Sequence, residues 1–152
     1  MPMKIGQPKL VLDPYQWLPG YGESKVSFHS VGVDVVLEVD YEKEVSDPEG
    51  VGEITLLYRR QITFKFARYF FSAPFPGATP FEFTGDSSDF NLGKLTEFLD
   101  SEFVKDSMRV WRSVSSHNAP NLRHFCIQFL SENIGFHVLA EDVFLSDELP
   151  VD

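Results

Sequence analysis

Residues 54–66 read ITLLYRRQITFKF, and this stretch decides the fold that the sequence predicts. Side chains alternate between the two faces of a β-strand, so residues two apart share a face. Every even-numbered position except Arg60 holds a large apolar or aromatic side chain. This period of two predicts a strand whose even-numbered side chains point into the core. The same parity reaches Phe70, with a second interruption at Arg68, so we expect the chain to bend or change sheets near these two arginines.

The sequence on either side predicts further strands and one helix. Residues 32–41 alternate in the same way, and we expect them to pair with residues 54–66 across the acidic loop 43–52, with Tyr41 opposite Ile54. Residues 123–130 and 136–144 predict a second hairpin, with Phe129 opposite Phe136. Between the hairpins, apolar side chains recur at helical spacing and predict the principal helix near residues 91–105. These side chains are Leu92, Leu95, Phe98, Leu99 and Phe103.

Together these elements predict an α+β fold in a single domain, residues 1–152. We expect a strongly curved, mainly antiparallel β-sheet of about six to eight strands, with the helix packed on its apolar face. The alternative is a β-barrel or sandwich with the helix at one end. Residues 145–152 form an acidic tail that we expect to fray.

The composition narrows the classes of partner and compartment. The chain has 152 residues, and 13 Lys+Arg against 23 Asp+Glu give a net charge of −10. Nucleic acids and anionic membranes both attract positive charge, so we expect neither as a partner. The single cysteine, Cys126, excludes an internal disulfide and multi-cysteine zinc motifs. No apolar run approaches the roughly 18 residues of a membrane-spanning helix, and we expect a cytoplasmic protein.

The common motifs of enzymes are missing from the sequence. It contains no glycine-rich phosphate loop, no His-Glu-x-x-His and no Gly-x-Ser-x-Gly. We therefore expect no catalytic residues, no bound metal and no cofactor.

Acidic side chains gather in residues 34–53, where eight acids against one lysine give a net charge of −7. Four of them share one face of the predicted strand: Asp34, Glu38, Asp40 and Glu42. A solvated sheet face that aids solubility is the plainer interpretation. The functional interpretation is a docking face for a basic protein, since complementary charge raises the rate and specificity of association.

A polar group on the second hairpin is the next candidate. His124, Cys126, Gln128, His137 and Glu141 share one face of it. A histidine beside a carboxylate could act as a general base, and a nearby cysteine could supply a thiolate. A single hairpin face makes no pocket, so a satisfied histidine and an inert cysteine are the plainer interpretation.

Two arginines, Arg60 and Arg68, occupy otherwise apolar positions. They could pair with the acidic strand or mark strand ends. Alternatively, a curved sheet could gather them with His124, His137 and Glu141 around a small pocket that binds an anion or another small molecule.

The C-terminal third contains SEFV at residues 101–104, LRHFCIQF at 122–129 and GFHVLAE at 135–141. With the nearby Trp111 and the phenylalanine-rich strand upstream, these motifs resemble small bacterial α+β domains, some of which are immunity proteins encoded beside secreted toxins. The resemblance implies a toxin-neutralising role and no catalysis.

The leading expectation for function is a non-enzymatic immunity or inhibitor protein that neutralises a basic partner, such as a toxin, through the acidic face. A second interpretation is a small-molecule binder, or an enzyme of no recognised class, that uses the concave face of the sheet. A third is a structural subunit of a homo-oligomer, for example a homodimer, paired through an exposed strand edge.

Overall fold

The computed structural model describes residues 3–19, 25–50, 52–74, 81–83, 92–114, 120–131 and 133–151. The elements within them are β1 (Met3–Ile5), β2 (Pro8–Leu12), the 3-10 helix η1 (Pro14–Gln16), β3 (Lys25–Val31), β4 (Asp34–Ser46), β5 (Glu53–Lys65), β6 (Tyr69–Pro74), β7 (Phe81–Phe83), β8 (Leu95–Phe98), α1 (Glu102–Val114), β9 (Arg123–Phe129), β10 (Ile134–Ala140), β11 (Asp142–Leu145) and β12 (Leu149–Pro150). The α+β class and the mainly antiparallel pairing are confirmed, but the strands are more numerous than we expected.

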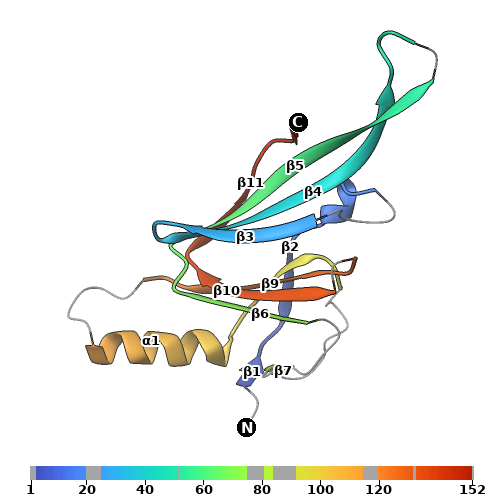
Figure 1. Ribbon diagram of the computed structural model, residues 1–152. Helices are drawn as coiled ribbons and strands as arrows, with labels where there is room; N and C mark the ends of the chain where they lie inside the picture. Colours follow the sequence, from blue (N-terminus) through green and yellow to red (C-terminus); the bar gives the residue numbers. More distant parts are fainter. Residues whose placement is uncertain are drawn as a thin grey trace.

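Two antiparallel sheets lie face to face, and helix α1 lies on the far side of one of them (Figure 1). The order β2-β8-β9-β10-β6 forms the sheet next to the helix, which we call the helix-side sheet. The order β11-β5-β4-β3 forms the hairpin sheet, and β12 also pairs with β5. A short parallel pair, β1 with β7, adjoins the helix. Among the described strands neither sheet closes on itself, so the fold is layered and is not a barrel.

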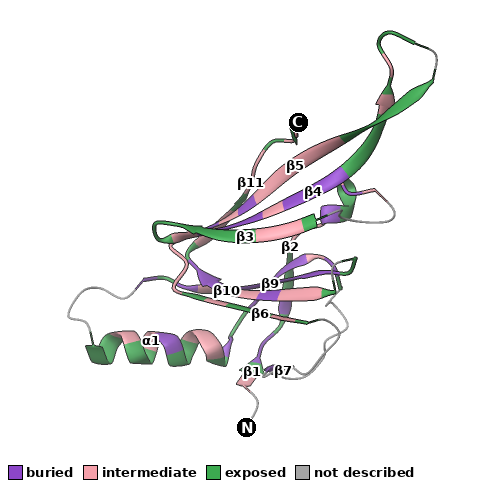
Figure 2. Cartoon of the chain, in the orientation of Figure 1, coloured by how far each residue is buried: buried purple, intermediate pink, exposed green. Residues whose placement is uncertain are grey.

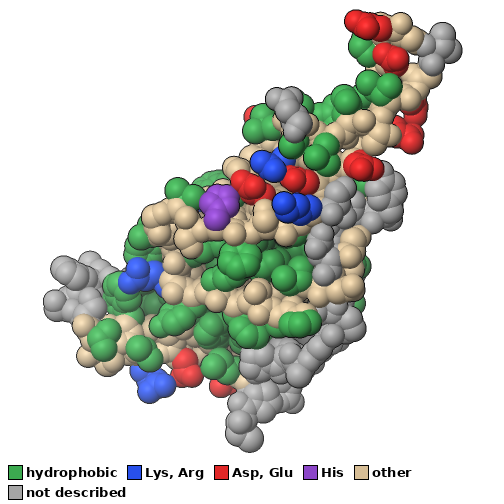
Figure 3. All heavy atoms as spheres, viewed as in Figure 1, with side chains coloured by type: hydrophobic (Ala, Val, Ile, Leu, Met, Phe, Trp, Pro, Cys, Tyr) green, Lys and Arg blue, Asp and Glu red, His purple; other side chains and the backbone are tan. Residues whose placement is uncertain are grey.

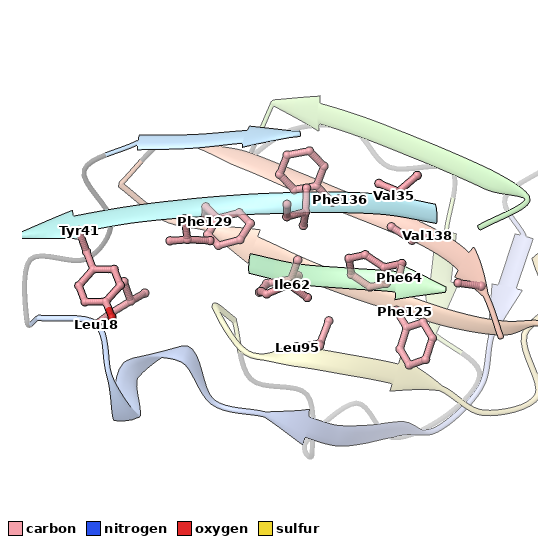
Figure 4. Packing of buried hydrophobic residues seen from close by; sticks show 14 residues of the cluster. Leu18, Val35, Tyr41, Ile62, Phe64, Leu95, Phe125, Phe129, Phe136 and Val138 are labelled. Atoms are coloured by element: carbon pink, nitrogen blue, oxygen red, sulfur yellow. The ribbon is translucent and has the colours of Figure 1, made fainter. Parts of the chain in front are cut away.

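The core fills the space between the two sheets (Figure 4). Ile62 and Phe64 of β5 are fully buried, as the alternation in residues 54–66 predicts. They face Phe125 and Phe136 of the helix-side sheet, and the ring centroids of Phe64 and Phe125 are 5.8 Å apart. Figure 2 shows the buried residues concentrated where the sheets overlap. One expectation was a small-molecule pocket on the concave face of the sheet. Packed side chains fill the inner faces of both sheets instead.

The chain crosses from the hairpin sheet to the helix-side sheet between β5 and β6, close to Arg68 as predicted. Phe66 has a φ of 52°, a left-handed conformation that residues other than glycine rarely adopt. Its backbone N–H donates to Oδ1 of Asp34 over 3.0 Å, which holds this corner in place. Arg60 marks no bend, because β5 runs through it without interruption.

Both hairpins pair in registers that differ from the predicted ones. Tyr41 lies opposite Tyr58 and not Ile54, because β4 continues to Ser46 and the turn is shorter than expected. Phe129 lies opposite Ile134 and not Phe136. Both shifts are by an even number of residues, so each side chain keeps its predicted face.

The helix expected near residues 91–105 is wrong in position. Residue 91 lies outside the described part of the chain, Leu95–Phe98 is the buried strand β8, and the helix begins at Glu102. The segment 95–98 pairs with β2 on one side and β9 on the other. These backbone hydrogen bonds outweigh a helical spacing that only a few apolar residues support. Asp100, with a φ of 62°, turns the chain from the strand toward α1.

The acidic tail does not fray over residues 145–151. Leu149 and Pro150 pair with β5, and the N–H of Val151 donates to the carbonyl of Leu57 over 2.9 Å. The hydroxyl of Tyr41 also donates to the Glu148 carboxylate. In the described residues, no helix is both long and apolar enough to cross a membrane.

Candidate functional site

The predicted acidic docking face lies on the outer face of β4. It consists of Asp34, Glu38, Asp40 and Glu42. Arg59 on β5 donates two hydrogen bonds to Asp40, 2.7 Å from Nε to Oδ1 and 3.1 Å from Nη2 to Oδ2, and this pairing raises the pKa of Arg59. Its Nε also lies 3.7 Å from Oε2 of Glu38. Lys65 Nζ lies 2.7 Å from Oδ2 of Asp34, and this hydrogen bond lowers the pKa of Asp34. Partners within the hairpin sheet therefore engage three of the four carboxylates.

Beyond these pairs, β4 and β5 extend past the body as a twisted hairpin (Figure 1). We call residues 42–57 the hairpin arm. It holds the single cation Lys43 and five carboxylates, those of Glu42, Glu44, Asp47, Glu49 and Glu53. Lys43 is itself bound to Glu148, with Nζ 3.0 Å from Oε1. Figure 3 shows acidic side chains along this projection.

Two carboxylates of the arm, Glu44 on β4 and Glu53 on β5, are diagonal neighbours across the paired strands. A proton on Glu53 allows it to donate a hydrogen bond to Glu44, and this contact together with the charge of Glu44 raises the pKa of Glu53. Like charges so close together oppose folding of the arm unless a cation from outside neutralises them.

The other face of the arm is mainly apolar, because the inward parity of the core continues outward along both strands, and Lys43, opposite Leu56, is the charged residue on it. Ile54 and Leu56 are each 38% exposed there, beyond the reach of the helix-side sheet. At the base of the arm a cleft of about 350 Å³ is lined by Trp17, Leu18, Pro19, Glu42, Lys43 and Glu44. The arm therefore combines exposed apolar area, excess carboxylate and a concave base.

The polar residues of the second hairpin form a different kind of site. The face that we predicted to be polar is turned away from the core between the sheets, and the side chains join in a chain of hydrogen bonds. Ser101 Oγ lies 2.8 Å from Nδ1 of His124, and Nε2 of His124 lies 2.9 Å from Nδ1 of His137. Nε2 of His137 lies 3.7 Å from Sγ of Cys126, which also accepts from Nε2 of Gln128 at 2.9 Å. We call these five residues the histidine cluster.

The surroundings of the histidine cluster keep it uncharged at neutral pH. Burial lowers the pKa of His124 to about 3, with a further contribution from His137. Burial also lowers the pKa of His137 to about 4 and raises the pKa of Cys126 to about 12. Aromatic rings enclose the first histidine, with Phe81 and Phe98 both 5.1 Å from it between ring centroids.

The histidine cluster therefore has no activated nucleophile. A thiol with so high a pKa stays protonated, and an imidazole with so low a pKa is a weak base. In neutral form each imidazole donates through one nitrogen and accepts through the other, so the chain of bonds is satisfied in either direction. No group of three metal-ligating side chains is placed to hold an ion in the described ranges. The cluster ties Ser101, just before α1, to the centre of the helix-side sheet.

The structure does not gather the expected pocket residues into one place. Arg60 lies over the ring of Trp17 at 5.3 Å, whereas Arg68 lies over Trp111 at 4.2 Å. Glu141 is exposed and contributes its backbone N–H to the carbonyl of Lys65. Only His124 and His137 come together.

Ser101 was missed by the sequence interpretation. The predicted helix ran through position 101, so no signal set this serine apart from other helical residues. Its partner His124 and Ser101 itself line a cleft of about 280 Å³ beside the start of α1. The charged residues on that cleft are already paired, Arg123 with Glu97 at 2.8 Å and Lys105 with Asp100 at 2.5 Å.

Comparison of the chain with protein-family models, with curated proteins and with solved structures finds no match.

Proposed function

We propose that this protein is a non-enzymatic interaction module that binds a basic protein through the hairpin arm. The observation that supports this most directly is the arm itself, which projects from the body with five carboxylates and one lysine that is already paired. A projecting acidic surface attracts a basic partner over a longer range than contact forces do, and it selects against acidic ones.

The apolar face of the arm supplies the area that such a complex would bury. Carboxylates mainly speed and orient association, whereas buried apolar contacts slow dissociation. Ile54 and Leu56 offer that area next to the carboxylates. The cleft at the base, between Trp17 and Glu44, suits a lysine or arginine side chain of the partner.

An immunity or inhibitor role against a basic toxin fits this surface and the resemblance of the C-terminal third. The uncharged state of the histidine cluster favours binding over catalysis. The proposal moves the docking surface outward from Asp34, Glu38 and Asp40, whose carboxylates have partners within the sheet, to the arm beyond Glu42.

A charge-reversal comparison tests the proposal. The chain and the triple variant Glu44→Lys, Glu49→Lys, Glu53→Lys serve as baits for proteins of the native cell. We expect the unmodified chain to retain a basic protein that the triple variant loses. With that protein purified, association should slow as salt is added for the unmodified chain and depend little on salt for the variant.

The matched control reverses three exposed acids of the body, Asp106, Glu141 and Asp147, and so makes the same change in net charge. It should retain the partner. Equal loss from both triple variants would mean that net charge alone drives binding, and full retention by the arm variant would remove the arm from the interface. Either result contradicts the proposal.

A further inference from the structure

Among the described residues, no further strand pairs with the outer edge of β3 or of β6, and these two edges lie on the same side of the molecule. β3 is the last strand of the hairpin sheet, and β6 is the last strand of the helix-side sheet. The two edges are neighbours, because the ring centroids of Phe28 on β3 and Phe70 on β6 are only 4.6 Å apart. Figure 3 shows hydrophobic side chains gathered over this part of the surface.

β3 has only one of the usual protections of a strand edge, the charged Lys25 at its start. Its seven residues, KVSFHSV, contain no proline and no acid, and they pair with β4 without a break in register. Phe28 is 49% exposed, and Val31 and Val33 are exposed beside it. An edge of this kind pairs readily with another strand.

Charge favours a second copy of this chain as the strand that pairs here. Two chains of net charge −10 repel each other over most of their surfaces. This repulsion is weakest at the edge formed by β3 and β6, because residues 25–31 and 69–74 contain no carboxylate. Their charged or titratable side chains are Lys25, His29 and Tyr69. A twofold axis brings this edge against its own copy and keeps the acidic arm away from it.

The strand is also self-complementary. Antiparallel pairing about Phe28 sets this ring beside its symmetry mate, Lys25 opposite Val31, and Ser27 opposite His29. No like charges oppose each other, and two half-exposed aromatic rings become a cross-strand pair. We infer that the free edge of β3 is the interface of a homodimer, in which two hairpin sheets join into one continuous sheet.

The register allows a test that leaves the core intact. Ser27 and His29 face away from the core. Their cross-strand neighbours on β4 are Glu38 and Val36, which share that outer face. The variant Ser27→Lys, His29→Lys places lysine opposite lysine twice across the axis, whereas Ser27→Lys, His29→Glu places lysine opposite glutamate twice. The two variants differ only at position 29, so any difference in association reports the pairing.

Sedimentation equilibrium over a wide range of concentration measures the outcome. We expect a dimer for the unmodified chain and for the Lys/Glu variant, and a dimer dissociation constant at least about tenfold higher for the Lys/Lys variant. The arm variant should remain a dimer, which separates this inference from the proposed function. A monomeric unmodified chain, or equal association of the two β3 variants, would overturn it.

Discussion

Ser101 Oγ lies 2.8 Å from Nδ1 of His124, and this contact ties the start of α1 to the central strand of the helix-side sheet. The serine and the histidine are both buried, so neither can exchange the other for water without opening the structure. The bond continues through His137 to Cys126, and the stability of the fold depends on all of these groups remaining neutral.

The free energy of unfolding should decrease as the pH is lowered below about 6.5. Burial lowers the pKa of His124 to about 3 and that of His137 to about 4, from 6.5. Between these values the two histidines bind protons in the unfolded chain but not in the folded chain, so acid favours unfolding. Above pH 6.5 neither state binds these protons, and the full stability is present. Each histidine should cost up to about 1.4 kcal/mol of unfolding free energy per pH unit over that interval. Urea denaturation at pH 7 and pH 5 measures the loss, and a His124→Gln variant should show a shallower one. An equal loss in both proteins would contradict this assignment.

Removing the Ser101 hydroxyl should destabilise the fold without changing its shape. Ser101→Ala leaves a buried imidazole nitrogen without its partner, which costs about 1–3 kcal/mol. Chemical denaturation provides the measurement. Ser113→Ala is the control, since that serine is exposed on α1 and its hydroxyl donates to the carbonyl of Val110. A control that loses as much stability as Ser101→Ala would argue against a special role for the cluster.

The Arg59–Asp40 pair should contribute a measurable coupling energy. Asp40 is 7% exposed and accepts both hydrogen bonds of the guanidinium. A double-mutant cycle with Arg59→Met and Asp40→Asn should give about 1 kcal/mol, at the upper end for surface pairs. The same cycle on Lys105 and Asp100, both well exposed, should give no measurable coupling. Indistinguishable values for the two cycles would count against a structural role for Asp40 in the acidic docking face.

Cys126 should resist thiol reagents until the protein unfolds. Its side chain is 2% exposed, and burial raises its pKa to about 12, so almost no thiolate is present at pH 8. Labelling by a thiol reagent should be slow in buffer and fast in urea. Fast labelling of the folded protein would mean that the histidine cluster opens to solvent.

Strand parity could be predicted from the sequence, whereas register could not. The alternation in residues 54–66 is local, and it places Ile62 and Phe64 in the core wherever the partner strand lies. Register depends on where the turns fall, and a slide of two or four residues keeps the apolar faces together. Tyr41 therefore lies opposite Tyr58, four residues along β5 from the predicted partner Ile54.

The candidate site divides in the same way. The excess of acid in residues 34–53 and the shared face of His124, Cys126 and His137 follow from composition and period alone. The pairing of Asp40 with Arg59, the projection of the hairpin arm and the contact of His124 with Ser101 do not.

By itself the sequence determined which side chains face inward on β4, β5, β9 and β10, because a period of two is a property of each strand. Only the tertiary structure decided that residues 95–98 form a strand, which acids have partners, and that Ser101 reaches His124. Those outcomes depend on backbone bonds and contacts between segments far apart in the chain, and no local pattern specifies which segments meet.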